Sequence, residues 1–235
     1  MNILAIDTAT EACSAALYIN GELSSSYQLA PREHSRLILK MIDGLLTEAD
    51  LPVNKLDAIA FGRGPGSFMG LRIAAGVVQG IAFAHDIPVI PVSTLKAIAQ
   101  RAFEQTKNKH ILTAIDARMD EVYWAVYSLN KGLWQLEGEE QVISPDNIHL
   151  ATILAQQDKT WVAAGTGWAS YKDRLLLTAN CQLPTIFLPD CLPSAEVIAK
   201  LAVDEFNAGN TITAAEAIPV YLRNDVAKKP KPVVF

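Results

Sequence analysis

The chain carries the same arrangement of residues twice, 109 positions apart. "ILAIDT" at 3–8 is a short apolar run that ends in an acid, and an apolar stretch with an Asn-Gly turn follows it. "LTAIDARMDEVYWAVYSLNKGL" at 112–133 repeats this layout. Ala5, Ile6 and Asp7 correspond to Ala114, Ile115 and Asp116, and Ala16 and Tyr18 correspond to Ala125 and Tyr127. We therefore predict a duplicated unit of strand, acidic turn and hairpin, with one copy in each half.

Helices and strands alternate through the rest of the chain. The patterns predict helices at about 33–49, 67–85 and 94–103, one opened by Ser144-Pro145, and one at 195–207, with strands at about 56–61, 87–93, 160–165 and 184–189. We predict an α/β fold of two tandem lobes with mixed sheets flanked by helices. The first lobe spans 1–105 and is joined by the helix at 194–208. The second lobe spans 106–193 after a polar linker at 104–110, and 226–235 forms a flexible tail.

Composition and charge restrict the possible partners. Half of the residues are hydrophobic and only 19% are charged, which favours a chain that covers part of its surface with a partner. The net charge of −5 and the scattered basic residues argue against a protein that grips RNA alone. The three cysteines show no CxxC spacing, and the N-terminus does not resemble a signal peptide, so we expect a cytoplasmic protein. The longest mostly apolar stretch, 71–84, is too short to span a bilayer, and we expect no membrane contact.

The stretch "AFGRGPGSFMGLRIAAG" at 60–76 resembles a phosphate-binding loop without matching one. Its glycine spacing fits neither a P-loop nor a dinucleotide fingerprint. Gly64, Gly66 and Ser67 precede a predicted helix, whose N-terminus would favour an anion. The alternative is a tight strand-to-helix turn that binds nothing.

Two predicted helices have unusual faces. Apolar residues of the helix at 33–49 span about 200° of arc, whereas a surface helix needs only a stripe of about 100° to reach its own core. The excess requires a second partner, which is either the neighbouring helix or another chain. In the helix at 67–85, Gly76 and Gly80 are four residues apart, and small residues at this spacing let another backbone approach closely.

The polar residues form no recognisable catalytic set. Asp7 and Asp116 occupy matching turns and could hold a metal–nucleotide complex across a cleft, or they could cap their own turns, which lack glycine. The four histidines show no metal-binding spacing, Ser67 lacks the GxSxG context of a nucleophile, and Cys13 is placed in a strand. We therefore expect no catalytic residue and no metal site.

Several motifs resemble the bacterial TsaB (YeaZ) family. They are "ILAIDTAT", "HSRLILKMIDGLL", "FGRGPGSFMGLRIAAGVVQGIA", "IPVIPVSTLKAIA", "AIDARMDEVYWAVY" and "PVYLR", and the resemblance runs from Met1 to about Arg223. The stretch 61–82 is the most specific. Met69 departs from the family pattern, which has Thr there. More widely, the duplicated lobes resemble the RNase H-like lobes of the actin/hexokinase superfamily of ATPases.

The resemblance implies a non-catalytic subunit for the tRNA modification threonylcarbamoyladenosine at position 37. Such a subunit would bind and activate the transferase TsaD, help to recruit the P-loop ATPase TsaE, contact tRNA only through the complex and form a homodimer when alone. The implied partner interface is His34, Leu37, Ile38, Met41, Leu45, Leu71, Arg72, Ala75 and Gln79. No cofactor would be tightly bound, but ATP or ADP with Mg²⁺ at the complex interface would lie near Asp7, Thr8, Gly64, Gly66, Ser67 and Asp116.

Three other functions remain open on the sequence alone. The first is a nucleotide-binding kinase or ATPase of the same superfamily, with Asp7 and Asp116 holding magnesium. The second is a glycoprotease-like peptidase, against which the missing nucleophile and zinc sets argue. The third is a homodimer that binds an unidentified ligand.

Overall fold

A computed structural model describes residues 1–154, 160–178 and 185–223 of the chain. Its first sheet has the order β3-β2-β1-β4-β5. The strands are β1 (Asn2–Asp7), β2 (Ala12–Ile19), β3 (Glu22–Leu29), β4 (Ala58–Gly64) and β5 (Val89–Ser93). β1, β2 and β3 form an antiparallel meander, while β4 is parallel to β1 and β5 is parallel to β4. β5 lies at the edge of the sheet, as its two prolines predicted: Pro88 directly precedes the strand and Pro91 lies within it.

The second sheet repeats the topology of the first. Its order is β8-β7-β6-β10-β11, with β9 (Gln141–Ile143) paired to β7. The strands are β6 (His110–Arg118), β7 (Glu121–Asn130), β8 (Leu133–Leu136), β10 (Trp161–Ala164) and β11 (Thr185–Leu188). Again three antiparallel strands are followed by two parallel ones. The common order confirms two tandem RNase H-like lobes of the actin-like type.

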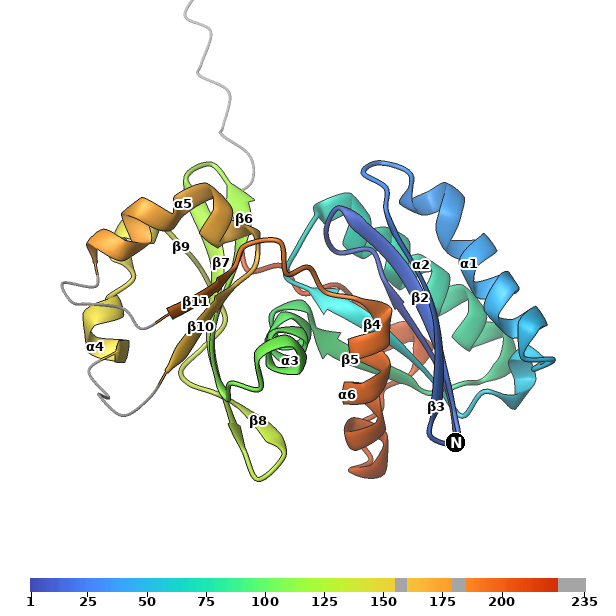
Figure 1. The fold of residues 1–235 in the computed structure, drawn as a ribbon. Helices are drawn as coiled ribbons and strands as arrows, with labels where there is room; N and C mark the ends of the chain where they lie inside the picture. Colours follow the sequence, from blue (N-terminus) through green and yellow to red (C-terminus); the bar gives the residue numbers. More distant parts are fainter. Residues whose placement is uncertain (155–159, 179–184, 224–235) are drawn as a thin grey trace, which may run out of the picture.

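The helices cover both faces of each sheet (Figure 1). On the outer faces lie α1 (His34–Glu48) and α2 (Phe68–His85) against the first sheet, and α4 (Leu150–Leu154) and α5 (Thr166–Leu177) against the second. Between the two sheets lie α3 (Thr94–Thr106) and α6 (Ala195–Asn207). α6 packs on the first sheet and α3 mainly on the second, so the last helix of each half crosses to cover the other half.

This exchange bears on the predicted domain limits. The helix predicted at 194–208 packs against the first sheet, but α3 buries Ile98 and Ala102 against the second sheet although it lies within 1–105. The linker predicted at 104–110 is shorter, because α3 continues to Thr106 and β6 begins at His110. The predicted tail at 226–235 lies outside the described residues.

The predicted helix starts are mostly confirmed. Ser67 and Ser93 cap α2 and α3 by accepting hydrogen bonds from the backbone N–H groups of Gly70 and Lys96, at 3.3 Å and 3.2 Å. Ser194 precedes α6 without using its side chain as a cap. The helix predicted from Ser144-Pro145 is instead a 3₁₀ turn at Pro145–Asn147, and α4 starts only after it.

Residues at matching sequence positions in the two copies of the repeat point to opposite faces of their sheets, as if one strand were shifted by one residue. Ala5 packs on the inner side with α6, whereas its sequence counterpart Ala114 packs on the outer side with α5. β6 has an irregularity between Asp116 and Arg118, and its hairpin turn is shorter than that of β1. Because side chains alternate along a strand, a shift of one residue turns every side chain to the other face. Matching sequence positions therefore do not occupy matching positions in space.

Candidate functional site: the glycine turn, the paired acids and the outer helices

The glycines at the start of α2 accommodate the chain's own backbone. A Cβ on Gly66 would overlap the carbonyl oxygen of Ala9, and a Cβ on Gly70 would overlap that of Thr8. The Ser67 N–H donates to the Ala9 oxygen at 2.7 Å, and the Thr8 hydroxyl donates to the Gly70 oxygen at 2.6 Å. Glycine is thus required here because the β1–β2 turn presses against the turn before α2.

The proposed anion-binding residues lie together but are largely occupied by one another. Gly64 has a φ of +112°, and a Cβ there would lie 2.7 Å from the carbonyl oxygen of Val220. The Ser67 hydroxyl caps α2, and Thr8 bonds back to the same turn. This geometry favours the tight-turn alternative over a phosphate cradle.

Asp7 lies fully buried at the end of β1. It faces the inner side of the first sheet, where it meets the backbone of Gly62 close to the side chain of Ile198 on α6. Neither of its carboxylate oxygens has a hydrogen-bond partner among the residues that the structure describes. Burial raises the pKa of Asp7 to about 7, while the backbone of Ala9 acts weakly in the opposite direction.

Asp116 faces the other way and has several partners. It accepts hydrogen bonds from the backbone N–H of Arg118 at 2.8 Å, from the guanidinium of the same residue at 3.2 Å and from the hydroxyl of Ser170 on α5 at 3.1 Å. Of the two alternatives for these acids, a shared site across a cleft is therefore not supported, because the one-residue shift between the repeats turns Asp7 and Asp116 to opposite sides. The two acids do not fit a shared Mg²⁺–nucleotide site.

The two described cysteines and His34 are held inside the fold. Burial raises the pKa of both Cys13 and Cys191 to about 11, and the charge of Asp7 adds to the effect at Cys13. The ring of His34 hydrogen-bonds to the Thr10 carbonyl oxygen at 2.9 Å and so ties α1 to the β1–β2 turn. Within 1–154, 160–178 and 185–223 there is no group of three or more His, Cys, Asp or Glu residues that could hold a metal.

Most of the predicted interface residues belong to the chain's own core. His34, Ile38, Leu45, Leu71 and Ala75 are all buried in the folded chain. These five side chains offer a partner little or no surface in this fold, which argues against a place for them in an interface. The reason is that α1 and α2 lie side by side on one sheet, so much of the wide apolar arc of α1 is covered by the first sheet and α2.

The four other predicted residues reach the surface to different extents. Leu37 and Met41 are half-buried on α1, and Arg72 is exposed on α2. Gln79 is half-buried and donates a hydrogen bond from its side-chain amide to the Ala217 carbonyl oxygen at 3.2 Å. A partner could therefore reach Leu37, Met41 and Arg72 without any change in the fold.

The exposed side of α2 is smooth and apolar. We define the outer helix face as Met69, Ile73, Gly76, Val77, Gly80 and Phe83 of α2 together with Leu37, Leu39 and Met41 of α1; all are exposed or half-buried. Nothing lies within 4 Å of a Cβ built on Gly76 or Gly80, so this side of the helix is open. By length and composition alone α2 is apolar enough to cross a membrane, but its other side packs into the core of the first lobe.

A cluster that the sequence pattern did not reveal lies at the start of α2. The guanidinium of Arg72 stacks on the ring of Phe68 at 3.8 Å, and its Nε donates to the Tyr221 hydroxyl at 3.1 Å. The Val220 N–H donates to the Arg63 oxygen at 2.8 Å, so the segment 217–223 lies against the glycine turn. The motif "PVYLR" was the only sign of this contact in the sequence.

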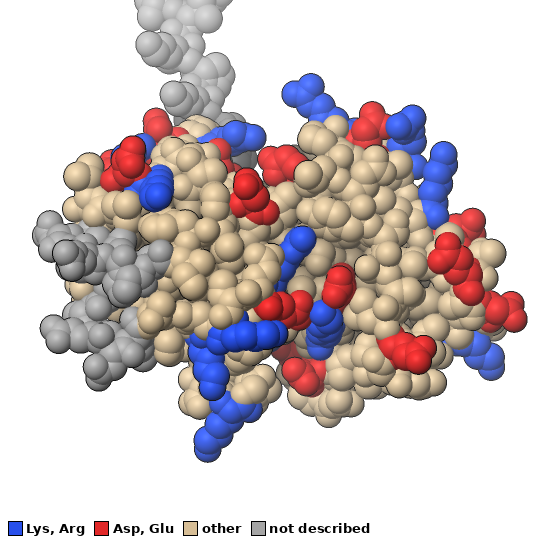
Figure 2. Space-filling model, viewed as in Figure 1, with Lys and Arg blue, Asp and Glu red and all other residues tan. Residues whose placement is uncertain are grey.

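Charge is scattered rather than concentrated on the visible face. Figure 2 shows acidic and basic side chains interspersed around the edges and along the seam between the lobes, with wide uncharged areas between them. In the seam, Lys96 pairs with Glu205 at 2.8 Å, and Lys200 pairs with Glu104 at 3.1 Å. This side of the molecule offers no broad basic surface of the kind that binds nucleic acid.

Comparison with known proteins identifies the family. The chain is 43% identical to the tRNA threonylcarbamoyladenosine biosynthesis protein TsaB of Escherichia coli, over 99% of both chains, and 42% identical to TsaB of Haemophilus influenzae, over 99% of this chain and 98% of the relative. The chain belongs to the TsaB family. The solved structure of YeaZ from Pseudomonas aeruginosa, 44% identical, superposes with a TM-score of 0.86 over 94% of this chain and 99% of that one.

This TsaB chain also matches a transferase family. The model of that family, described as TsaD, tRNA N6-adenosine threonylcarbamoyltransferase, matches residues 25–229. The transferase of Chlorobium limicola is 33% identical over 47% of this chain and 35% of the relative. The matched range includes both α1 and α2, the two helices that carry the outer helix face of this chain.

Proposed function

We propose that this TsaB chain serves tRNA threonylcarbamoyladenosine biosynthesis as a non-catalytic subunit that binds and activates a TsaD transferase through its outer helix face. The printed name of its relatives supports the pathway. The observation that carries the interface is the open side of α2, where Gly76 and Gly80 meet no other part of the described chain.

The relation to TsaD makes such a contact chemically suitable. A helix with glycines four residues apart allows the backbone of a second helix to approach closely. Since the TsaD family model covers both outer helices, the transferase carries a related pair, and two related faces can pair around an approximate two-fold axis. When TsaD is absent, the same face of two TsaB chains would meet in a homodimer.

The geometry of the acids supports an accessory rather than a catalytic role. Asp7 is buried on the inner side, while Asp116 is held by Arg118 and α5. A kinase or ATPase with these two acids as magnesium ligands would require them to converge. We infer that any ATP or ADP with Mg²⁺ at the complex interface takes its metal ligands from the partner.

The further partners follow from the same role. We propose that TsaE is recruited by the assembled TsaB–TsaD surface and that tRNA reaches this subunit only through the complex, in the cytoplasm. The net charge of −5 and the interspersed charges in Figure 2 disfavour binding of RNA by the isolated chain. The corresponding measurement is gel-shift titration of tRNA with TsaB alone and with the complex.

The interface is tested by placing a charge where the fold has room for it. Gly80→Glu adds a side chain into open space on α2, so the chain should fold with its thermal midpoint unchanged or slightly higher. We expect the variant to lose co-elution with TsaD in size-exclusion chromatography. In cells whose normal gene is replaced by the variant gene, we expect the tRNA to lack the modified nucleoside.

The matched control is Ala169→Glu, which adds the same charge at an exposed position on α5 of the other lobe. It should retain both TsaD binding and the modification. Undisturbed co-elution of Gly80→Glu with TsaD would contradict the proposed interface.

A further inference from the structure

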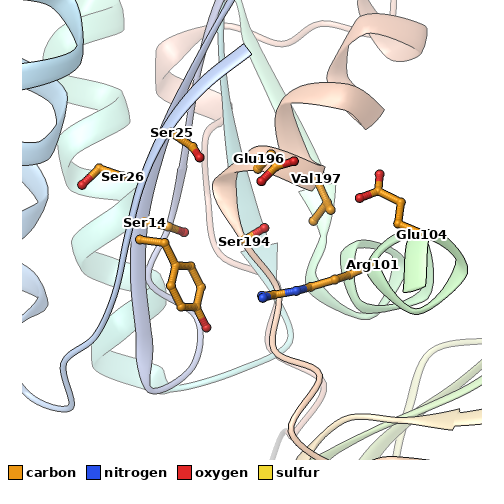
Figure 3. Close-up of a pocket in the computed structure, with 9 residues that line it drawn as sticks. Ser14, Ser25, Ser26, Arg101, Glu104, Ser194, Glu196 and Val197 are labelled. Carbon is orange, nitrogen blue, oxygen red and sulfur yellow. The ribbon is translucent and has the colours of Figure 1, made fainter. Parts of the chain in front are cut away.

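A cavity lies on the inner side of the first lobe, away from the outer helix face. It has a volume of about 280 Å³ and lies between β3, α3 and the first turn of α6. Figure 3 shows the side chains that surround it. They include Ser14, Tyr27, Arg101, Ser194 and Glu196. Hydroxyl groups and charges of both signs therefore share one small space.

One end of the cavity is formed by the start of α6. The Ala195 N–H donates to the Ser14 hydroxyl oxygen at 2.9 Å, and the following N–H groups of a first helical turn have no acceptor within the helix. Ser194, at the N-cap, is only 7% exposed, and its side chain makes no capping bond. Within the described part of the chain, its hydroxyl has no hydrogen-bond partner. Ser194 lines the cavity, so this hydroxyl can reach a ligand that binds there.

Arg101 adds a positive charge at the same end. Its Nη1 donates to the Leu192 carbonyl oxygen at 2.8 Å, and its guanidinium lies over the Tyr27 ring at 5.2 Å. No carboxylate pairs with it among the residues described. Figure 3 shows the end of Arg101 extending into the space beneath Ser194. The helix N-terminus, the hydroxyl and the guanidinium together suit a carboxylate group.

Negatively charged side chains also line the cavity. Glu104 and Glu196 both line the cavity, and both carboxylates bind the single ammonium group of Lys200, at 3.1 Å and 2.8 Å. Two acids thus share one lysine, which leaves a negative charge uncompensated. Figure 3 shows the Glu104 carboxylate pointing away from the end of Arg101. This region suits an ammonium group.

We propose that this cavity binds a small zwitterion of the α-amino acid type. The carboxylate contacts Ser194, Arg101 and the first turn of α6, and the ammonium group contacts Glu104 and Glu196. A ligand with both charges satisfies both ends of the cavity, whereas a simple anion would lie close to two carboxylates. This site does not depend on the proposed TsaD interface, since none of its residues belongs to the outer helix face.

The test uses three probes of nearly the same size with the complete chain: L-alanine, propionate, which lacks the ammonium group, and ethylamine, which lacks the carboxylate. In ¹⁵N–¹H correlation spectra, L-alanine should shift the amide signals of Glu196 and Val197 saturably, with a dissociation constant in the millimolar range. Propionate and ethylamine should each bind at least about tenfold more weakly, because each leaves one charged end unpaired.

Two variants then test the assigned residues. Ser194→Ala removes the free hydroxyl without removing a capping bond, and Arg101→Gln removes the charge; each should weaken L-alanine binding by about tenfold. Arg36→Gln, at an exposed position on α1, should bind as the wild type does. The proposal is overturned if L-alanine produces no saturable shift, if propionate binds equally well, or if Ser194→Ala retains full affinity. A thermal melt confirms that each variant is folded.

Discussion

Asp7 gives the sharpest test of the structure, because it is a fully buried carboxyl group with no hydrogen-bond partner among the residues described. Burial raises the pKa of Asp7 from an ordinary value of 3.8 to about 7 in the folded chain. Between these two values the folded state binds the proton and the unfolded state does not. Stability must therefore fall as the pH rises through this window and must level off above it.

The size of this effect follows from the two pKa values. At pH 5 the folded group is protonated, whereas most unfolded chains have lost this proton. Part of the loss of folding stability is therefore already present at pH 5. At pH 8 the loss is nearly complete. The difference between pH 5 and pH 8 is about two pKa units, which corresponds to roughly 2 to 3 kcal/mol in the free energy of unfolding.

Asp7→Asn removes the titration with little change in shape. Urea denaturation of the wild type and the variant at pH 5 and pH 8 gives four free energies of unfolding. Relative to the wild type, we expect the free energy of unfolding of Asp7→Asn to be higher at pH 8 than at pH 5 by roughly 2 to 3 kcal/mol. Other titrating groups cancel because they are the same in both chains. The control Asp43→Asn, exposed on α1, should show no such gain. If the difference in the free energy of unfolding between Asp7→Asn and the wild type is the same at pH 5 and pH 8, the proposed buried proton on this group is refuted.

Three other predictions rest on individual contacts. Gly70→Ala should destabilise the chain by roughly 2 to 3 kcal/mol, because its Cβ would overlap backbone, whereas Gly76→Ala in the same helix should stabilise it by about 0.5 to 1 kcal/mol; urea denaturation measures both. Ile38→Glu should cost roughly 4 kcal/mol or more and Leu39→Glu within about 0.5 kcal/mol, since the first side chain is buried and the second is 55% exposed; thermal melts distinguish them. The thiol of Cys13 should resist alkylation at pH 8 in the native chain and react in urea, because burial raises its pKa to about 11, and peptide mass spectrometry detects the difference.

The fold was largely predictable because its signals are local. Hydrophobic periodicity, serine caps before α2 and α3, and the repeated strand, acid and hairpin unit depend on residues that are close in sequence. The crossing of α3 and α6 was not predictable in full. Which sheet a helix covers depends on contacts between segments far apart in the chain, and α3 carries apolar residues that would suit either sheet.

The candidate site was less predictable for the same reason. The width of the apolar arc on α1 correctly indicated two neighbours, and one of them is α2 of the same chain, so five of the nine predicted interface residues are buried. The role of Arg72 at the surface emerged only with its contact to Tyr221, 149 residues later in the chain.

The sequence by itself determined the duplicated architecture, the positions of most helices and strands, and the family. Each of these follows from local residue patterns or from the order of the motifs along the chain. Only the folded chain shows that Asp7 and Asp116 turn to opposite sides, that the glycine turn is filled by the β1–β2 backbone, and that Gly76 and Gly80 remain open. These outcomes depend on a one-residue difference in strand register and on the packing of distant segments, and no local pattern encodes either.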